Sequence, residues 1–261
     1  MIMQNKLYVI GVGPGDPELL TLKAARIIRE SQVICVPKGR EEGNSLALSI
    51  VQKIINLNDK EIIEAYFPMR KTKRQGHGLR VMGHKETPLA PCPLPLTPDN
   101  DLDVKWNQTA ETILTKLTEG QNVAFLTLGD PSFYSTFYYL YDKLLDLHPD
   151  LSIEIIPGVS SINASAARAK ISLGLGDDGI AILPANYMNN LKATLEAFDT
   201  VVLMKVHKVF DQIVALLQEM NLIDKASCIS QAGMETEKIF KDIRNVKQED
   251  LSYFSMVIVR K

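Results

Sequence analysis

Two short polar turns, each following an apolar run, hold residue types suited to binding a small polar ligand. In LTLGDPSFYST, residues 126–136, Gly129 and Asp130 come directly after the apolar run 122–128. A glycine lets a ligand approach the backbone, and a carboxylate accepts hydrogen bonds from a hydroxyl or an ammonium group. If the run is a parallel strand, both residues lie at its carboxyl end, where open α/β sheets bind ligands. The Asp-Pro step is equally consistent with a simple chain turn.

The second turn, GVGPGDP at residues 11–17, lies between a predicted strand and a predicted helix. This is the position of a dinucleotide-binding fingerprint, but the third glycine of that pattern is missing and prolines stiffen the turn. No acidic residue ends the next strand, where the chain reads Cys35, Val36, Pro37 and Lys38. The pattern therefore argues against a nicotinamide-dependent oxidoreductase. It fits either a tight strand-to-helix turn or backbone contacts to a different ligand.

Polar and sulfur-containing side chains stand at two later strand ends. Ser160 and Ser161 precede a predicted helix, where small hydroxyls and backbone amides suit a carboxylate or another polar group. Ser160 could equally cap that helix. Met204 ends a β-branched run and, taken alone, is typical of a core position. The titratable side chains nearest to these turns are the candidates for catalysis: Tyr134, Tyr138 and Lys205.

Alternating strands and helices are expected to position these turns. Apolar runs predict strands at 6–12, 32–36, 61–67, 122–128 and 152–156, and helical spacing predicts helices at 19–31, 44–56, 106–119 and 136–147. Such alternation is typical of an α/β domain with a mostly parallel sheet. Later helices are expected at 160–169, 191–197 and 209–220, with strands at 179–183, 200–205, 226–231, 238–242 and 255–260. The last strands have no helices between them, which predicts antiparallel pairing in a mixed sheet.

Proline and glycine mark the borders of these units. Pro37 is expected to stop the second strand, and the proline-rich, aperiodic segment at about 68–105 predicts a long loop. The Pro157-Gly158 step divides the chain into an N-terminal domain, residues 1–156, and a C-terminal domain, residues 157–261.

Composition restricts the class of protein. The net charge of −2 lacks the basic excess typical of nucleic-acid binders, so no nucleic-acid partner is expected. No apolar run approaches the roughly 18 residues that cross a bilayer, and the first residues lack a signal-peptide pattern. The widely spaced Cys35, Cys92 and Cys228 suit reduced thiols, so we expect a cytoplasmic protein. His77, His84 and Cys92 match no usual zinc spacing, and no metal is expected.

Four segments occur in an order that resembles a known family. GVGPGDPELLT at 11–21, FLTLGDPSFYST at 125–136, IPGVSS at 156–161 and VVLMKV at 201–206 are similar to the tetrapyrrole methylases of the cobalamin and sirohaem pathways. GDPSFYST, with LALSIV upstream and Tyr253–Ser255 near the end, is most similar to the branch that methylates carbon 20 of precorrin-2 or cobalt-factor II. The resemblance covers nearly the whole chain. It implies a two-domain α/β homodimer that binds S-adenosylmethionine in the cleft between its domains.

The resemblance also implies roles for particular residues. It places the cofactor against nine residues of these segments and of SQAGMET, residues 230–236: Pro14, Leu128, Gly129, Asp130, Phe133, Ser160, Ser161, Met204 and Gly233. Gly13 and Gly15 would line the mouth of a trough for the tetrapyrrole. Some relatives carry an acidic residue just after the second strand, in a role proposed as a base. Here that stretch is Val36-Pro37-Lys38-Gly39, so the sequence assigns no base.

The implied substrate carries carboxylates around its rim, so a basic contact surface is expected. Between residues 70 and 85 the chain holds six basic residues and no acidic one. Guanidinium groups pair with carboxylates through two parallel hydrogen bonds. The hypothesis is that Arg70, Lys71, Lys73 and Arg74 bind the substrate, and the alternative is a solvated run of charge.

Methyl transfer from a sulfonium to an electron-rich meso carbon needs mainly alignment of the reactants and exclusion of water. Three alternatives stay open. One is another tetrapyrrole methylase, of the sirohaem type or acting at a different ring position. Another is a ribosomal-RNA methyltransferase of the same fold, which the acidic net charge disfavours. The third is an S-adenosylmethionine-binding module without catalysis.

Overall fold

The computed structural model describes residues 5–39, 44–67, 100–185 and 190–261. The first half of the chain forms a five-stranded sheet with the order β3-β2-β4-β1-β5. Its strands are β1 (Leu7–Gly11), β2 (Val33–Lys38), β3 (Glu61–Tyr66), β4 (Val123–Thr127) and β5 (Ile153–Ile156). All of the pairings are parallel. Because β1 lies between β4 and β5, the turns that follow these three strands emerge at one edge of the sheet.

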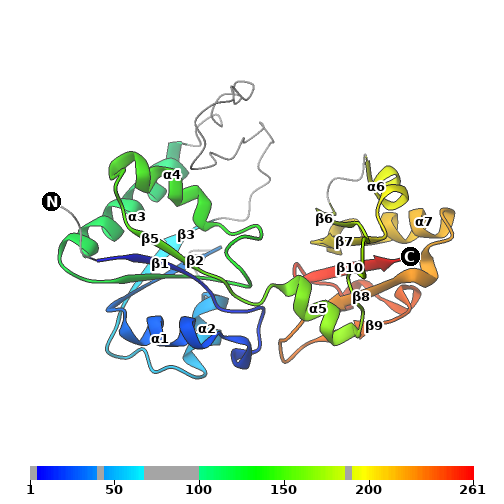
Figure 1. Ribbon diagram of the computed structural model, residues 1–261, viewed down its shortest axis with the longest axis horizontal. Coiled ribbons are helices and arrows are strands. Elements are labelled where there is room, and N and C mark those ends of the chain that lie inside the picture. Colours follow the sequence, from blue (N-terminus) through cyan, green and yellow to red (C-terminus); the bar gives the residue numbers. More distant parts are fainter. Residues whose placement is uncertain (1–4, 40–43, 68–99, 186–189) are drawn as a thin grey trace.

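Helices cover both faces of this sheet (Figure 1). The helices α1 (Leu22–Glu30) and α2 (Leu46–Gln52) pack on one face, and α3 (Asn100–Thr118) and α4 (Phe137–Leu147) pack on the other. In β4, Val123 and Phe125 join the core under α3 and α4, whereas Ala124 and Leu126 join the core over α1 and α2. Successive side chains of a strand point to opposite faces, so a strand covered on both sides is apolar throughout.

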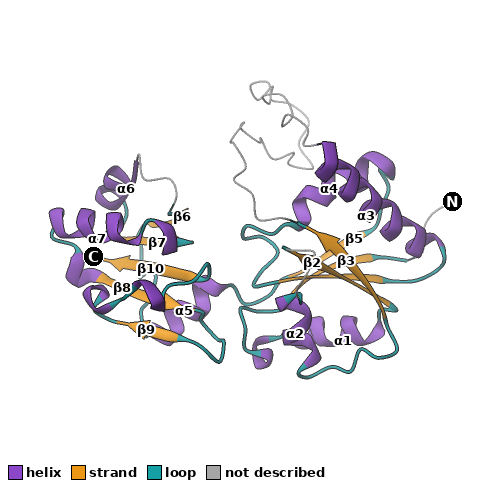
Figure 2. Cartoon of the chain, turned by 180° about the vertical axis from the view of Figure 1, so that it is seen from behind, coloured by secondary structure: helices purple, strands orange, loops and turns teal. Residues whose placement is uncertain are grey.

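The second half forms a mixed sheet with the order β6-β7-β10-β8-β9. Its strands are β6 (Ile180–Pro184), β7 (Thr200–Met204), β8 (Ala226–Ser230), β9 (Lys238–Phe240) and β10 (Ser255–Arg260). β6 and β7 are parallel, while β10 is antiparallel to β7 and β8, and β8 is antiparallel to β9. The helices α6 (Leu191–Ala197) and α7 (Phe210–Glu219) cover one face, and α5 (Ser161–Ala169) covers the other, beside the first half (Figure 2). The expected α/β fold with antiparallel last strands is confirmed.

Two expected boundaries are wrong. β2 continues through Pro37 to Lys38, because its pairing with β4 ends at Cys35 and only β3 runs beside it further on. A residue without an amide hydrogen is tolerated where a strand is paired on one side only. The helix α3 begins at Asn100 rather than at 106, so the predicted loop at about 68–105 is too long. Asp101 and Asp103 stand in the first turn of this helix, where acidic residues are favoured.

Candidate functional site

The predicted turns after β1 and β4 join at Gly13 and Gly129. The Gly129 N–H donates to the Gly13 carbonyl at 2.8 Å, and the Gly13 N–H donates to the Gly129 carbonyl at 3.3 Å. Both residues have positive φ angles, 81° and 72°, which side chains with a Cβ rarely adopt. A Cβ added to Gly129 would meet no atom nearer than the Ser161 nitrogen at 3.8 Å. The space beside this buried glycine lets a ligand approach the backbone.

Asp130 ties the turn after β4 to the turn after β5. Its Oδ2 accepts a hydrogen bond from the Gly158 N–H at 2.9 Å, and its Oδ1 accepts one from the Ser132 N–H at 2.7 Å. The residue is 9% exposed, and a carboxylate so buried needs such donors. The alternative of a turn-forming role is therefore confirmed. Each carboxylate oxygen has a second lone pair, so Asp130 keeps capacity to accept from a ligand hydroxyl.

Ser160 is the N-cap of α5, as its structural alternative predicted. The Asn163 N–H donates to Ser160 Oγ at 3.2 Å, and the Ser160 backbone is extended. The amides of Ser161 and Ile162 stand in the first turn of the helix, where no intrahelical carbonyl can accept from them. Such amides suit a carboxylate or another polar ligand group. A direct ligand contact of Ser160 or Ser161 stays a prediction.

The turn after β1 contacts the second half of the chain at Gly233. A Cβ added to Gly233 would lie 3.5 Å from Pro14 Cγ and 3.2 Å from the Asp16 nitrogen. A Cβ added to Gly15 would lie 2.5 Å from Met234 Cγ. Pro14 and Gly233, which the sequence places far apart, are thus neighbours across the junction of the two sheets.

A lysine and two tyrosines form a second contact across the junction. Lys205 Nζ lies 5.2 Å from the centre of the Tyr134 ring and 5.5 Å from the centre of the Tyr253 ring. Tyr134 stands between β4 and α4, whereas Lys205 follows β7 and Tyr253 precedes β10. Two of the three catalytic candidates therefore meet. The third, Tyr138, has its ring contacts with two other aromatic side chains of α4.

The apolar candidates differ in their exposure. Leu128 and Met204 are half-buried and pack against the cores of the first and second halves. Phe133 is 42% exposed although its ring is apolar, which leaves it available to cover a ligand.

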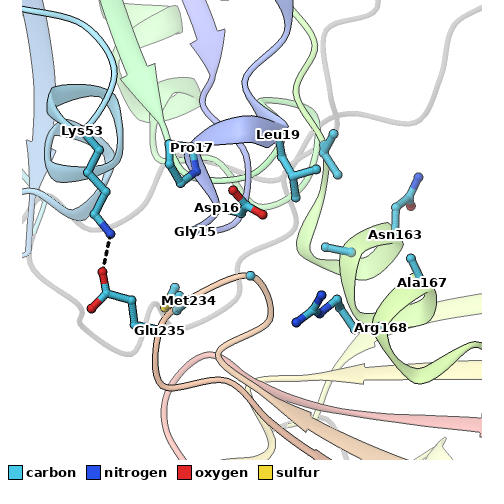
Figure 3. A pocket seen from close by; sticks show the side chains of 13 residues that line it. Gly15, Asp16, Pro17, Leu19, Lys53, Asn163, Ala167, Arg168, Met234 and Glu235 are labelled. Carbon is cyan, nitrogen blue, oxygen red and sulfur yellow. Dashed lines mark hydrogen bonds and ion pairs between the residues drawn. The ribbon is translucent and has the colours of Figure 1, made fainter.

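A cavity of about 660 Å³ opens at the junction on the side of α2 and α5 (Figure 3). Gly15 and Gly233 are the two predicted site residues that line it. Other lining residues belong to the same motif segments, among them Asp16 and Val159. Lys53 near the end of α2 and Asn163 and Arg168 on α5 also line the cavity and lie outside those segments. Lys53 Nζ lies 2.8 Å from Glu235 Oε1, so an exposed ion pair spans the junction at this cavity (Figure 3).

Glu237 fixes the loop that carries Gly233. Its Oε1 accepts from Arg168 Nε at 2.7 Å, and its Oε2 accepts from the Gly233 N–H at 2.7 Å. Burial alone raises the pKa of Glu237, but the Arg168 guanidinium and the Gly233 amide outweigh burial and hold that pKa below its usual value. The charged form is therefore favoured, and it joins α5 to the 231–237 loop.

Several predicted features lie outside the described residues: Arg70, Lys71, Lys73, Arg74, Arg80, Lys85, His77, His84 and Cys92. Within the described part of the chain, no three His, Cys, Asp or Glu side chains are grouped to hold a metal ion. Among the same residues, no helix is long and apolar enough to cross a membrane.

Fold and site together define an α/β protein of two five-stranded sheets, with its strand-end turns gathered at the junction of those sheets. The family model of the tetrapyrrole (corrin/porphyrin) methylases matches residues 6–245. The chain belongs to this family.

Two curated relatives match over nearly their whole length. A cobalt-precorrin-2 C(20)-methyltransferase of Salmonella typhimurium is 31% identical, over 99% of this chain and 98% of its own. A probable cobalt-precorrin-2 C(20)-methyltransferase of Methanocaldococcus jannaschii is 29% identical, over 98% of this chain and 96% of its own.

Solved structures share the fold at lower identity. A cobalt precorrin-4 methyltransferase described as a cobalamin biosynthetic enzyme has a TM-score of 0.66 at 18% identity, covering 98% of this chain and 94% of its own. The uroporphyrin-III C-methyl transferase of Thermus thermophilus, complexed with S-adenosyl homocysteine, has a TM-score of 0.59 at 18% identity and covers 98% of both chains.

Proposed function

We propose that this protein is an S-adenosylmethionine-dependent methyltransferase that methylates carbon 20 of precorrin-2 or cobalt-factor II in cobalamin biosynthesis. The observation that carries the proposal is the 31% identity, across both full chains, with a cobalt-precorrin-2 C(20)-methyltransferase. The relative from Methanocaldococcus jannaschii is a probable enzyme of the same activity. The meeting of the motif turns at one junction supports a shared site.

The proposed cofactor is S-adenosylmethionine, which would supply the methyl group as a sulfonium. The space beside Gly129, the remaining acceptor capacity of Asp130 and the first-turn amides of α5 fit a ligand with hydroxyl, ammonium and carboxylate groups. A solved structure of the same fold carries S-adenosyl homocysteine. The proposed contacts are those that the resemblance implies: Pro14, Leu128, Gly129, Asp130, Phe133, Ser160, Ser161, Met204 and Gly233.

The contribution of the chain to catalysis is mainly positioning. An electron-rich ring carbon attacks the methyl group in line, so the turns must hold the two reactants in register and keep water out. The stretch from Val36 to Gly39 holds no acidic residue, and the Nζ of Lys38, at the end of β2, pairs with Glu64 at 2.8 Å. The substrate is proposed to lie along Gly13, Gly15 and the basic segment that holds Arg70, Lys71, Lys73 and Arg74.

Further proposals concern the protein as a whole. We propose a division into domains at Pro157, which lies between the last strand of the first sheet and α5 of the second half. A homodimer, a cytoplasmic location and the absence of a nucleic-acid partner are proposed from the family resemblance, the cysteine pattern and the net charge of −2. Light scattering of the purified protein tests the dimer.

Isothermal titration with S-adenosylmethionine, followed by incubation with metal-free or cobalt-loaded precorrin-2, tests the proposed function. The expected result is saturable cofactor binding and a mass gain of one methyl group by the tetrapyrrole. Comparing the two rings decides whether cobalt is already present in the accepted substrate. Cofactor binding with no methylation of any precorrin would instead favour a binding module, and methylation of uroporphyrinogen would favour the sirohaem-type alternative.

A further inference from the structure

Lys205 presents its ammonium group at the junction between the two halves of the chain. Its Nζ lies over the Tyr134 ring, which belongs to the first half, and over the Tyr253 ring, which belongs to the second. A cation–aromatic contact depends on the charge of the ammonium group. It does not commit the N–H groups of that ammonium to a hydrogen-bond acceptor. The side chain is half-buried, so its position is defined while its donors stay available.

Backbone strain marks the same contact. Tyr134 and Lys205 have φ angles of 54° and 60°, the left-handed region that bulky side chains avoid. These strained residues come from opposite halves of the chain and touch each other through their side chains. Strained backbone persists where the surrounding structure enforces it, and it gathers at ligand-binding and active sites.

The charge of Lys205 has no counterion among the described residues. Other lysines of the second half have a counterion: Lys192 pairs with Glu219 at 2.8 Å, and Lys238 pairs with Asp250 at 2.7 Å. None of the ion pairs within the described ranges includes Lys205. Asp130, the buried acid in the turn after β4, does not pair with Lys205. Its carboxylate accepts hydrogen bonds from two backbone amides.

The chain neighbours of this cluster are proposed site residues. Lys205 directly follows Met204, and Tyr134 directly follows Phe133. We propose that Lys205 binds a carboxylate of the ligand at the junction, with Tyr134 and Tyr253 holding its ammonium in place. The inference rests on the proposed function, since both S-adenosylmethionine and a precorrin carry carboxylates. Lys205 is then an anion-binding residue and not the base that removes a proton.

The test compares Lys205→Met with Lys208→Met. Both changes remove one positive charge, and Lys208 is an exposed neighbour with no ion pair among the described residues. Cofactor affinity is measured by titration with S-adenosylmethionine. Tetrapyrrole affinity is measured by absorbance, with S-adenosyl homocysteine present, so neither measurement requires turnover. Lys205→Arg keeps the charge, and circular dichroism shows that each variant is folded.

Loss of a charge-assisted hydrogen bond weakens binding by about tenfold to a hundredfold. We expect Lys205→Met to weaken the binding of one of the two ligands by this factor. Lys205→Arg should recover most of the lost affinity, and Lys208→Met should leave the affinity for both ligands unchanged. Weaker S-adenosylmethionine binding assigns the carboxylate to the cofactor, and weaker tetrapyrrole binding assigns it to the substrate. If a folded Lys205→Met binds both ligands as tightly as Lys208→Met does, the inference is overturned. Failure of the wild-type protein to methylate would overturn the proposed function instead.

Discussion

The backbone of Gly158 lies directly against the backbone of Gly11, so that a Cβ added to Gly158 would stand 2.7 Å from the Gly11 carbonyl carbon and oxygen. The neighbouring Gly129 carbonyl would meet the same atom. Gly158 also donates its N–H to Asp130. The turns after β1, β4 and β5 therefore meet at one backbone contact, which positions the residues proposed to bind the cofactor.

This contact predicts that Gly158→Ala is destabilising out of proportion to its size. The clash is with backbone, which cannot move aside without shifting a strand end, so we expect a loss of at least about 2 kcal/mol in the free energy of unfolding. Gly176→Ala is the matched control: its φ is 55° but open space surrounds it, so about 1 kcal/mol is expected from backbone strain alone. Urea denaturation measures both. Equal losses would show that the close approach is relieved at little cost.

A pH dependence is expected from Glu237, whose pKa is lowered in the folded protein. A lowered folded pKa gives stability that is present above the unfolded value of about 4.3 and is lost as the pH falls through the folded value. Glu237→Gln should therefore lower the melting temperature at pH 7, and its difference from wild type should shrink below pH about 4. Glu249→Gln is the control, since the side chain of Glu249 is 76% exposed and its ion pair with Lys247 is long, at 3.9 Å. A difference that stays constant across this pH range would contradict the assignment.

Two cysteine thiols should be unreactive in the native protein. Burial raises the pKa of Cys35 far above its usual value and raises that of Cys228 to about 12. The thiolate is the reactive form, so both are protected by burial and by protonation. In a Cys92→Ser background we expect no thiol to react with Ellman's reagent at pH 8, and both to react in denaturant. Rapid labelling of the folded protein would show that one of these cores opens readily.

The basic segment predicts an effect on the substrate alone. Changing Arg70, Lys71, Lys73 and Arg74 together to Gln should raise the KM for the tetrapyrrole by about tenfold or more and leave S-adenosylmethionine affinity unchanged, because several carboxylate contacts are lost. The control removes four exposed charges elsewhere: Lys170, Lys208, Lys225 and Lys241. An unchanged KM would favour a solvated run of charge.

The fold was largely predictable because its signals are local. The apolar run of β4 and the Gly-Asp turn after it identify a buried strand and its carboxyl end without tertiary information. The predicted end of the second strand at Pro37 is wrong, because a strand tolerates a proline where it has a neighbour on one side only. The pairing of β2 with β4 ends at Cys35, before the proline. The early start of α3 had a signal in its Asn and Asp residues, which the nearby prolines outweighed.

The site was predictable in part, since its motif residues are close in sequence to strand ends. The sequence could not show that the ammonium group of Lys205 lies over the rings of Tyr134 and Tyr253, because these three residues are distant along the chain. Lys53 and Arg168 likewise reach the junction cavity from ordinary helical positions. Such residues carry no motif, and only the packing of the two halves brings them to the site.

The position of the transferred methyl group tests the central claim most directly. The wild-type protein is incubated with precorrin-2, metal-free or cobalt-loaded, and S-adenosylmethionine labelled with carbon-13 in its methyl group. The product is then examined by mass spectrometry and carbon-13 NMR. We predict one labelled methyl group, bonded to carbon 20 of the macrocycle. A labelled methyl at any other ring position, or an unlabelled tetrapyrrole from protein that binds the cofactor, would contradict the account.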